Sequence, residues 1–177
     1  MHIDIQYLKT TLGELIIGSY DNKLCICDWR YRKMRAEIDK RIQTGLNAKY
    51  QEEETDTIRF TMQQIKEYLN GNRKIFDLPL ELVGTTFQKQ VWNELLKIPF
   101  GKTETYLSLS RKLNNEKAIR ALASANGANS ISIIVPCHRI IGSNGKLVGY
   151  AGGLHTKKKL LELESKNQIQ DQLNLFE

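Results

Sequence analysis

One stretch of the sequence decides the fold: Ile134-Val135-Pro136-Cys137-His138-Arg139-Ile140. Apolar residues and a proline lead into three reactive or charged side chains, and a further apolar residue follows them. A segment of this composition is expected to run through or beside a hydrophobic core. The thiolate is the reactive form of cysteine, and neighbouring positive charge lowers the thiol pKa. The stretch therefore favours Cys137 as an activated nucleophile over the alternative, a buried structural cysteine.

The net charge of the chain is concentrated in the segment that contains Cys137. The 177 residues include 26 Lys and Arg against 20 Asp and Glu, a net charge of +6. Residues 1–84 contribute 13 of each sign, residues 85–164 contribute 12 basic and 5 acidic, and residues 165–177 contribute 1 and 2. A basic segment beside a neutral one favours a polyanionic partner such as nucleic acid. The alternative, general solubility, would spread the charge more evenly.

Membrane and secretory signatures are not apparent in the sequence. No apolar run approaches the length of a membrane helix, and we expect no signal peptide. The three cysteines are an odd number without the spacing of a disulfide framework, which indicates a reducing compartment. We expect a cytoplasmic protein that has no membrane partner and acts as a monomer.

The first half of the chain has the pattern of a small α/β domain. Apolar residues that alternate with polar ones, in runs separated by turn residues, predict a β-meander over residues 3–30. Residues 31–54 predict a helix and then an acidic loop, and residues 55–70 have helical spacing that ends at an Asn-Gly turn. Alternating apolar residues predict a strand over residues 76–82, around Pro79.

Cys25 and Cys27 lie two residues apart on a predicted strand, so we expect them to face the same side. Such a pair is half of a metal site, but no second pair has suitable spacing and His2 is the only nearby candidate ligand. Apolar packing is therefore favoured over metal binding.

From Thr86 the pattern becomes helical. Ile98-Pro99-Phe100-Gly101 ends one helix, and two short helices separated by the polar turn at 114–116 then predict a helix-turn-helix. The second of these helices, over residues 117–126, is rich in small side chains. A smooth face of that kind suits close approach to a nucleic acid backbone, or equally tight packing against a neighbouring helix.

The Pro-Cys-His-Arg core and its apolar flanks resemble the active-site signature of the O6-alkylguanine-DNA alkyltransferases, which remove alkyl groups from guanine in DNA by direct reversal. The resemblance extends over some eighty residues, from Phe87 to Glu164, and is weak in the first half of the chain. It implies an α/β (α+β) fold with a small RNase H-like α/β domain over residues 1–84. A mostly helical, winged-helix-like helix-turn-helix domain over residues 85–164 and a tail over residues 165–177 follow.

The resemblance also implies the reaction and its catalytic residues. A methyl or alkyl group would pass irreversibly, once per molecule, from O6 of a flipped-out guanine in double-stranded DNA to Cys137. Transfer from O4 of thymine is an open question. His138 would act on the thiol through a bridging water, Glu164 would orient His138, and Asn129 would brace the active-site segment. No metal or organic cofactor is implied; some family members bind a structural zinc in the N-terminal domain, but this sequence lacks a full ligand set.

The family motif places further residues against the DNA or the flipped base. Tyr106 would contact the base, although a core aromatic is the alternative, and Arg120 would fill the gap that the extruded nucleotide leaves. Some relatives have serine at the position of Ala151, which leaves the range of alkyl groups open. The full set implied is Tyr106, Arg120, Ala121, Ala125, Arg139, Ile140, Tyr150, Ala151, Gly152 and Lys157.

Other functions remain as alternatives at this point: a protein that recognises alkylated DNA without repairing it, an alkylation-sensing regulator, or a cysteine hydrolase. The C-terminal residues Gln172, Leu173, Leu175 and Phe176 resemble the short peptide by which bacterial repair and replication proteins dock on the sliding clamp. An amphipathic end folded back on the body is the alternative.

Overall fold

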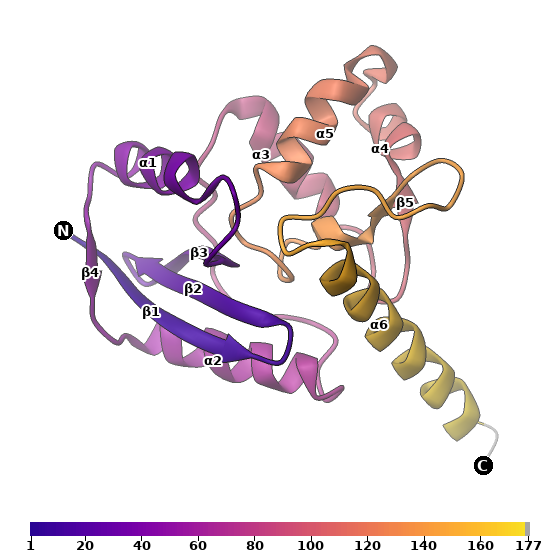
Figure 1. Ribbon diagram of the computed structural model, residues 1–177, viewed down its shortest axis with the longest axis horizontal. Helices are drawn as coiled ribbons and strands as arrows, with labels where there is room; N and C mark the ends of the chain where they lie inside the picture. Colours follow the sequence, from indigo (N-terminus) through magenta and orange to yellow (C-terminus); the bar gives the residue numbers. More distant parts are fainter. Residues whose placement is uncertain (176–177) are drawn as a thin grey trace.

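The computed structural model describes residues 1–175 and shows a sheet-containing N-terminal half beside a helical C-terminal half (Figure 1). The N-terminal half contains β1 (Ile3–Thr10), β2 (Gly13–Tyr20), β3 (Lys23–Trp29), α1 (Arg35–Gly45), β4 (Tyr50–Glu52) and α2 (Asp56–Leu69). The C-terminal half contains α3 (Thr86–Leu95), β5 (Glu104–Thr105), α4 (Tyr106–Lys112), η1 (Glu116–Ala118), α5 (Ile119–Gly127), η2 (Cys137–Arg139), β6 (Ile140–Ile141) and α6 (Leu154–Asn174).

The predicted β-meander is confirmed. The sheet has the order β3-β2-β1-β4, with the first three strands antiparallel. Asp21 and Asn22 connect β2 to β3 with φ of 48° and 60°, the left-handed pair that a two-residue hairpin turn requires. The acidic loop expected at residues 51–54 is only partly a loop. β4 pairs in parallel with β1, which the exposed polar side chains of Gln51 and Glu52 did not reveal.

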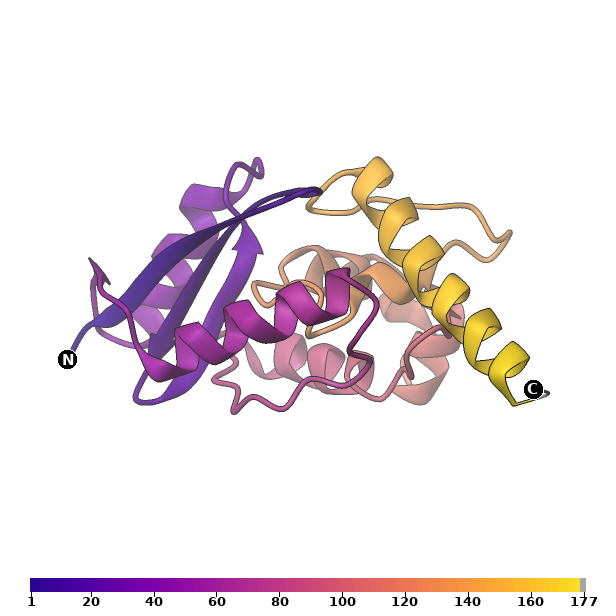
Figure 2. The ribbon, with the colours of Figure 1, turned by 90° about the horizontal axis from the view of Figure 1, so that it is seen from below.

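Two helices cover opposite faces of this sheet (Figures 1 and 2). Ile38 and Ile42 of α1 pack in one hydrophobic cluster, and Ile58 and Ile65 of α2 pack in another. The cluster under α2 continues without interruption into α3, α4 and α5, so the two halves of the molecule share a core. α2 therefore lies where the sheet meets the helical half.

The prediction that Cys25 and Cys27 face the same side is wrong. Ser19 pairs with Leu24 and Gly18 with Ile26, which leaves Cys25 as the extra residue of a β-bulge. The bulge shifts the alternation, and the two cysteines lie in different clusters.

The strand predicted over residues 76–82 is also wrong. This segment makes a single isolated bridge, between Leu24 and Leu80. Pro79 has no N–H to donate to a ladder, although its carbonyl accepts a hydrogen bond from Leu24 N at 2.8 Å. The leucines instead pack against the larger hydrophobic cluster.

The predicted helix-turn-helix is confirmed: α4 and α5 are adjacent and η1 forms part of the turn between them. α3 begins at a capping box in which the Thr85 side chain accepts from Gln88 N and the Gln88 side chain accepts from Thr85 N. Thr105 caps α4 in the same way, by accepting from Ser108 N.

The final helix extends ten residues past residue 164, where the C-terminal domain was predicted to end. α6 continues to Asn174 and projects away from the body, so the two termini lie at opposite ends of the molecule (Figure 2). Leu173 and Leu175 are exposed, and Phe176 of the clamp-like peptide lies outside the described residues. Within the part of the chain that the structure describes, no helix is long and apolar enough to span a bilayer.

Candidate active site

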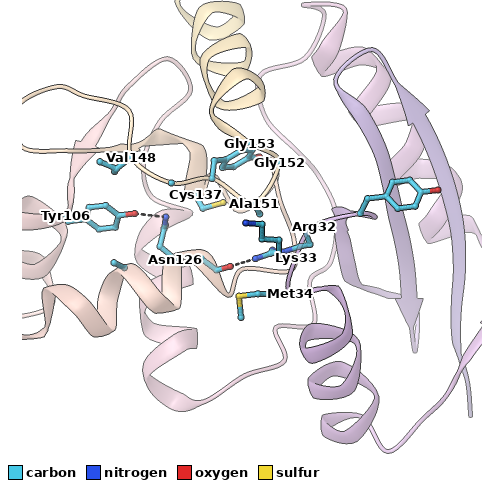
Figure 3. Close-up of a pocket in the computed structure, with 15 residues that line it drawn as sticks. Arg32, Lys33, Met34, Tyr106, Asn126, Cys137, Val148, Ala151, Gly152 and Gly153 are labelled. Atoms are coloured by element: carbon cyan, nitrogen blue, oxygen red, sulfur yellow. Dashed lines mark hydrogen bonds between the residues drawn. The ribbon is translucent and has the colours of Figure 1, made fainter.

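Cys137 lies at a cavity of about 860 Å³ between the two halves of the molecule (Figure 3). It starts the short helix η2, and its side chain is almost fully buried. The C-terminal half supplies most of the lining, and the loop after β3 supplies the rest. The lining residues are Tyr31, Arg32, Lys33, Met34, Tyr106, Ala123, Asn126, Gly127, Cys137, Val148, Gly149, Tyr150, Ala151, Gly152 and Gly153.

Asn129 hydrogen-bonds to the chain that leads to Cys137, which is the position that the family resemblance implies. Its Nδ2 donates to the Val135 carbonyl at 2.9 Å, and its Oδ1 accepts from Ile131 N at 2.9 Å. Between these contacts Ile133 has a φ of 73°, a left-handed conformation that is strained for a β-branched residue. The amide of Asn129 therefore stabilises a turn that the backbone alone would not favour.

A buried carboxylate organises the residues next to Cys137. Glu164 on α6 accepts a hydrogen bond from His138 Nε2 at 2.9 Å. Both of its oxygens also accept hydrogen bonds from the Arg139 guanidinium, at 2.7–3.1 Å. Gly101 N donates to its Oε2 at 3.2 Å, and Tyr68 donates to its Oε1 at 2.8 Å. The predicted His138–Glu164 contact is thus present, within a larger hydrogen-bonded group.

The charges in this group determine the tautomer of His138. Burial alone would raise the pKa of Glu164, but hydrogen bonds and charge from His138 and Arg139 outweigh burial and hold that pKa at about 2. An ionised carboxylate only accepts, so the hydrogen between the two residues is on His138 Nε2. Burial lowers the pKa of His138, which favours the neutral ring. Its Nδ1 is then an unprotonated acceptor, and this buried atom has no hydrogen-bond partner within the described structure.

The pKa of the Cys137 thiol is raised, not lowered as the neighbouring positive charge led us to expect. Burial raises the pKa of Cys137, and this outweighs the opposing effects of the Asn129 side chain, Arg32 and Lys157. Arg139, the adjacent cation, is neutralised by Glu164. The thiol therefore needs a base to become nucleophilic, and His138 Nδ1 is the adjacent candidate.

Tyr150 and the glycines around it form one side of the cavity. The Tyr150 hydroxyl accepts from Trp29 Nε1 at 3.2 Å, and its ring lies edge-on to His138 with centroids 6.5 Å apart. A Cβ on Gly152 would lie 2.7 Å from the Trp29 indole, so only glycine fits there. Ala151 lines the same side of the cavity (Figure 3).

Lys157 and Arg139, two of the residues expected near the base, bond to other parts of the protein. The buried Lys157 donates to the carbonyls of Ile140 and of Val148, the latter at 2.7 Å, and so ties the loop that contains Tyr150 to β6. Burial lowers the pKa of Lys157 to about 8. Arg139 is occupied by Glu164 and by the Ile98 carbonyl at 2.7 Å.

The outer face of α5 is smooth, as the small side chains predict. Arg120, Ala121 and Ser124 are exposed, whereas Leu122 and Ala125 are buried. Trp92 Nε1 donates to the Ala125 carbonyl at 2.8 Å, which fixes that inner side against α3.

Sequence reasoning missed several residues of the cavity. Asn126 Nδ2 donates to the Tyr106 hydroxyl at 3.3 Å, which leaves the hydroxyl hydrogen free to point elsewhere (Figure 3). The loop Tyr31–Met34 was not expected at the site, because nothing in its local sequence indicates a contact with residues a hundred positions later. Tyr68 was interpreted only as part of a helical apolar face.

The fold and the site together define a class: a two-part protein in which a helix-turn-helix lies beside a buried cysteine with a histidine–glutamate pair. Comparison with known sequences and structures agrees. The profile of the 6-O-methylguanine DNA methyltransferase ribonuclease-like domain matches residues 4–82, and that of the DNA binding domain of the same family matches residues 86–166. The chain belongs to this family.

Individual relatives match over nearly the whole chain. The methylated-DNA–protein-cysteine methyltransferase of Methanosarcina barkeri is 38% identical over 167 residues, which cover 94% of this chain and 99% of the relative. The O6-methylguanine methyltransferase of Mycobacterium tuberculosis has a similar structure, with a TM-score of 0.81, 33% identity and 99% coverage of both chains. A structure of the Mycobacterium tuberculosis protein OGT in complex with DNA matches with a TM-score of 0.78, 33% identity and 94% coverage of both chains.

Proposed function

We propose that this protein repairs DNA by irreversible transfer of a methyl or other alkyl group from O6 of guanine to Cys137. The observation that carries the proposal is the position of Cys137 at the cavity, directly before His138. The Nδ1 of this histidine has no hydrogen-bond partner among the described residues, and its Nε2 bonds to Glu164. Family membership and the DNA complex of the similar OGT structure support the choice of substrate.

The reaction begins with loss of the thiol proton. Because burial raises the pKa of Cys137, the thiol is not ionised in advance, and His138 Nδ1 accepts its proton through a bridging water. The sulfur then attacks the alkyl carbon, the new S–C bond forms as the C–O6 bond breaks, and the electron pair returns to guanine. Protonated His138 finally gives up the proton, which is delivered to N1 of the base, so unmodified guanine leaves, His138 is neutral again and Cys137 carries a thioether.

The lesion must leave the duplex before it can reach the thiol. Flipping a base out costs a few kcal/mol, and less for a damaged base that pairs poorly. The small exposed side chains of α5 would allow the helix to lie close to the DNA, and exposed Arg120 would occupy the gap left in the stack. Tyr106 lines the cavity and would contact the flipped base, and its hydroxyl hydrogen has no acceptor among the described residues.

The product determines the stoichiometry. A thioether has no good leaving group, and no described residue beside Cys137 offers a way to regenerate the thiol. Each molecule therefore acts once, and the proposal uses no metal or organic cofactor. The chemistry extends to O4 of thymine if that base fits the cavity.

A single-turnover assay tests this function. Duplex DNA with one O6-methylguanine is mixed with excess protein, and the base is followed by chromatography of the digested DNA. The wild type and Cys25→Ser should convert the base to guanine, whereas Cys137→Ser should bind the duplex without converting it. Binding without conversion by the wild type would favour the recognition-only alternative, and conversion by Cys137→Ser would exclude Cys137 as the acceptor.

A protein partner is proposed at the C-terminus. Gln172, Leu173, Leu175 and Phe176 form the peptide that resembles a sliding-clamp ligand, and Leu173 and Leu175 are exposed at the end of α6. Apolar side chains presented in this way suit insertion into a pocket of the clamp. A clamp should bind the full chain more tightly than a chain that ends at Asp171, and equal binding would contradict the proposal.

The protein is proposed to act as a monomer in the cytoplasm. The three free, buried cysteines Cys25, Cys27 and Cys137 support a reducing compartment. Fractionation of cells and the sedimentation of the purified chain test these two statements.

A further inference from the structure

Tyr68 brings the N-terminal half of the molecule into contact with the catalytic group. It lies near the end of α2, its side chain is fully buried, and its hydroxyl donates to Glu164 Oε1 at 2.8 Å. That oxygen is the same one that accepts from His138 Nε2 at 2.9 Å. Two hydrogen bonds that share one carboxylate oxygen thus link a residue of α2 to the histidine that activates Cys137.

The packing around Tyr68 fixes the direction of its hydroxyl. Its ring contacts Phe76 at a centroid distance of 5.4 Å and meets Phe100 edge-on at 6.1 Å. Burial and the neighbouring Glu164 carboxylate raise the pKa of Tyr68 well above its ordinary value. The hydroxyl therefore keeps its proton and acts as a permanent donor to Glu164.

Donors to one oxygen compete for its negative charge. Besides Tyr68, the ionisable groups that face Glu164 and His138 are Arg139 beside them on η2, Lys157 on α6, and Cys137 and Tyr150 at the cavity. Arg139 compensates the carboxylate charge through both oxygens, whereas Tyr68 donates only to the oxygen that His138 uses. A strong donor at Oε1 reduces the extent to which that oxygen can stabilise a protonated His138.

We propose that Tyr68 is a positioning residue of the reaction, which fixes Glu164 and keeps His138 in its neutral form, with Nδ1 available to the thiol of Cys137. The inference rests on the proposed function for its kinetic consequence, but its effect on His138 is independent of any activity. It gives the N-terminal half a part in the reaction, through α2 and Glu164.

The test compares two tyrosine-to-phenylalanine variants. Tyr68→Phe removes the donor to Glu164. Tyr50→Phe is the matched control, because Tyr50 donates to Asp39 at the same distance of 2.8 Å, far from the site. The titration of His138 is followed by NMR of ¹⁵N-labelled histidine, with exposed His2 and His155 as internal references. The pH dependence of the methyl transfer rate is measured on the same samples.

In Tyr68→Phe we expect the titration of His138 to move upward by about half a pH unit, since its hydrogen bond to Glu164 strengthens. At pH values below the His138 titration midpoint, the transfer rate should fall about threefold, because a shift of half a pH unit lowers the fraction of neutral His138 by that factor. Tyr50→Phe should match the wild type in both measurements. If Tyr68→Phe had a lower Tm but the same His138 titration and the same pH dependence of the transfer rate as the wild type, Tyr68 would have a structural role only. That result would overturn the proposal.

A second substitution avoids loss of the ring. Site-specific 3-fluorotyrosine at position 68 keeps the shape and strengthens the hydroxyl as a donor, so the His138 titration should move downward; an upward or absent shift would also overturn the proposal. If the wild type transferred no methyl group, the proposed function would fail, whereas the two titrations would still decide the role of Tyr68.

Discussion

Replacement of Glu164 by glutamine should be among the most damaging conservative substitutions in the protein. The change removes one negative charge and keeps the shape of the side chain. Glu164 and Arg139 are both buried, and their contacts are as short as 2.7 Å. In Glu164→Gln the guanidinium of Arg139 stays in the interior without a counter-charge, and His138 loses the partner that fixes its tautomer.

Two independent arguments give the size of the effect. Breaking a buried ion pair by removal of one partner costs about 3–5 kcal/mol. Separately, the shift of the Glu164 pKa from its ordinary 4.5 to about 2 corresponds to about 3 kcal/mol of stability at neutral pH. The transfer rate should fall roughly tenfold to a hundredfold, since part of the general-base contribution of His138 is lost.

The assay is urea unfolding at pH 7 combined with single-turnover methyl transfer. Glu162→Gln is the control, because Glu162 lies on the same helix, is half exposed, and forms long ion pairs of 3.8–3.9 Å with Lys158 and Lys159. Exposed pairs of this kind contribute about 0–1 kcal/mol. If Glu164→Gln unfolded within about 1 kcal/mol of the wild type and kept its transfer rate, the description of Glu164 as the centre of the site would be wrong.

Three further predictions follow from the same structure. Asn129→Ala should lower the free energy of unfolding by about 2–3 kcal/mol and slow transfer, because buried backbone groups lose their partners; unchanged urea unfolding and rate would contradict this. The free energy of unfolding should fall in acid, because the pKa values of both His138 and Glu164 are lower in the folded than in the unfolded state. The loss begins as pH falls through 6.5 and grows between pH 4.5 and about 2. Urea midpoints that rise below pH 6 would refute this prediction. Arg120→Ala should slow transfer from duplex DNA more than from single-stranded DNA, whereas Arg59→Ala should affect neither; equal slowing on both substrates would count against a role in flipping.

Local sequence patterns predicted the parts of the fold that depend on neighbouring residues. The hairpin turn at Asp21 and Asn22 and the two short helices of the helix-turn-helix each depend on chemistry within a few positions. The Pro-Cys-His-Arg stretch predicted a buried Cys137 for the same reason. These features need no knowledge of the rest of the chain.

The features that were missed depend on contacts between distant segments. The bulge at Cys25 follows from pairing with β2, and the short edge strand β4 forms because β1 offers an unpaired edge. The raised pKa of Cys137 depends on how deeply several elements bury it, which its charged neighbours do not reveal. Tyr68 and Glu164 are 96 positions apart, and only the shared core brings them together.

The most direct test of the central claim is the intact mass of the protein after incubation with an excess of duplex DNA containing O6-methylguanine. We predict a gain of one methylene mass, mapped by peptide sequencing to Cys137, that stops at one equivalent of repaired DNA. Repair that continued beyond one equivalent, or a methyl group found on Cys25 or Cys27, would contradict irreversible transfer to Cys137.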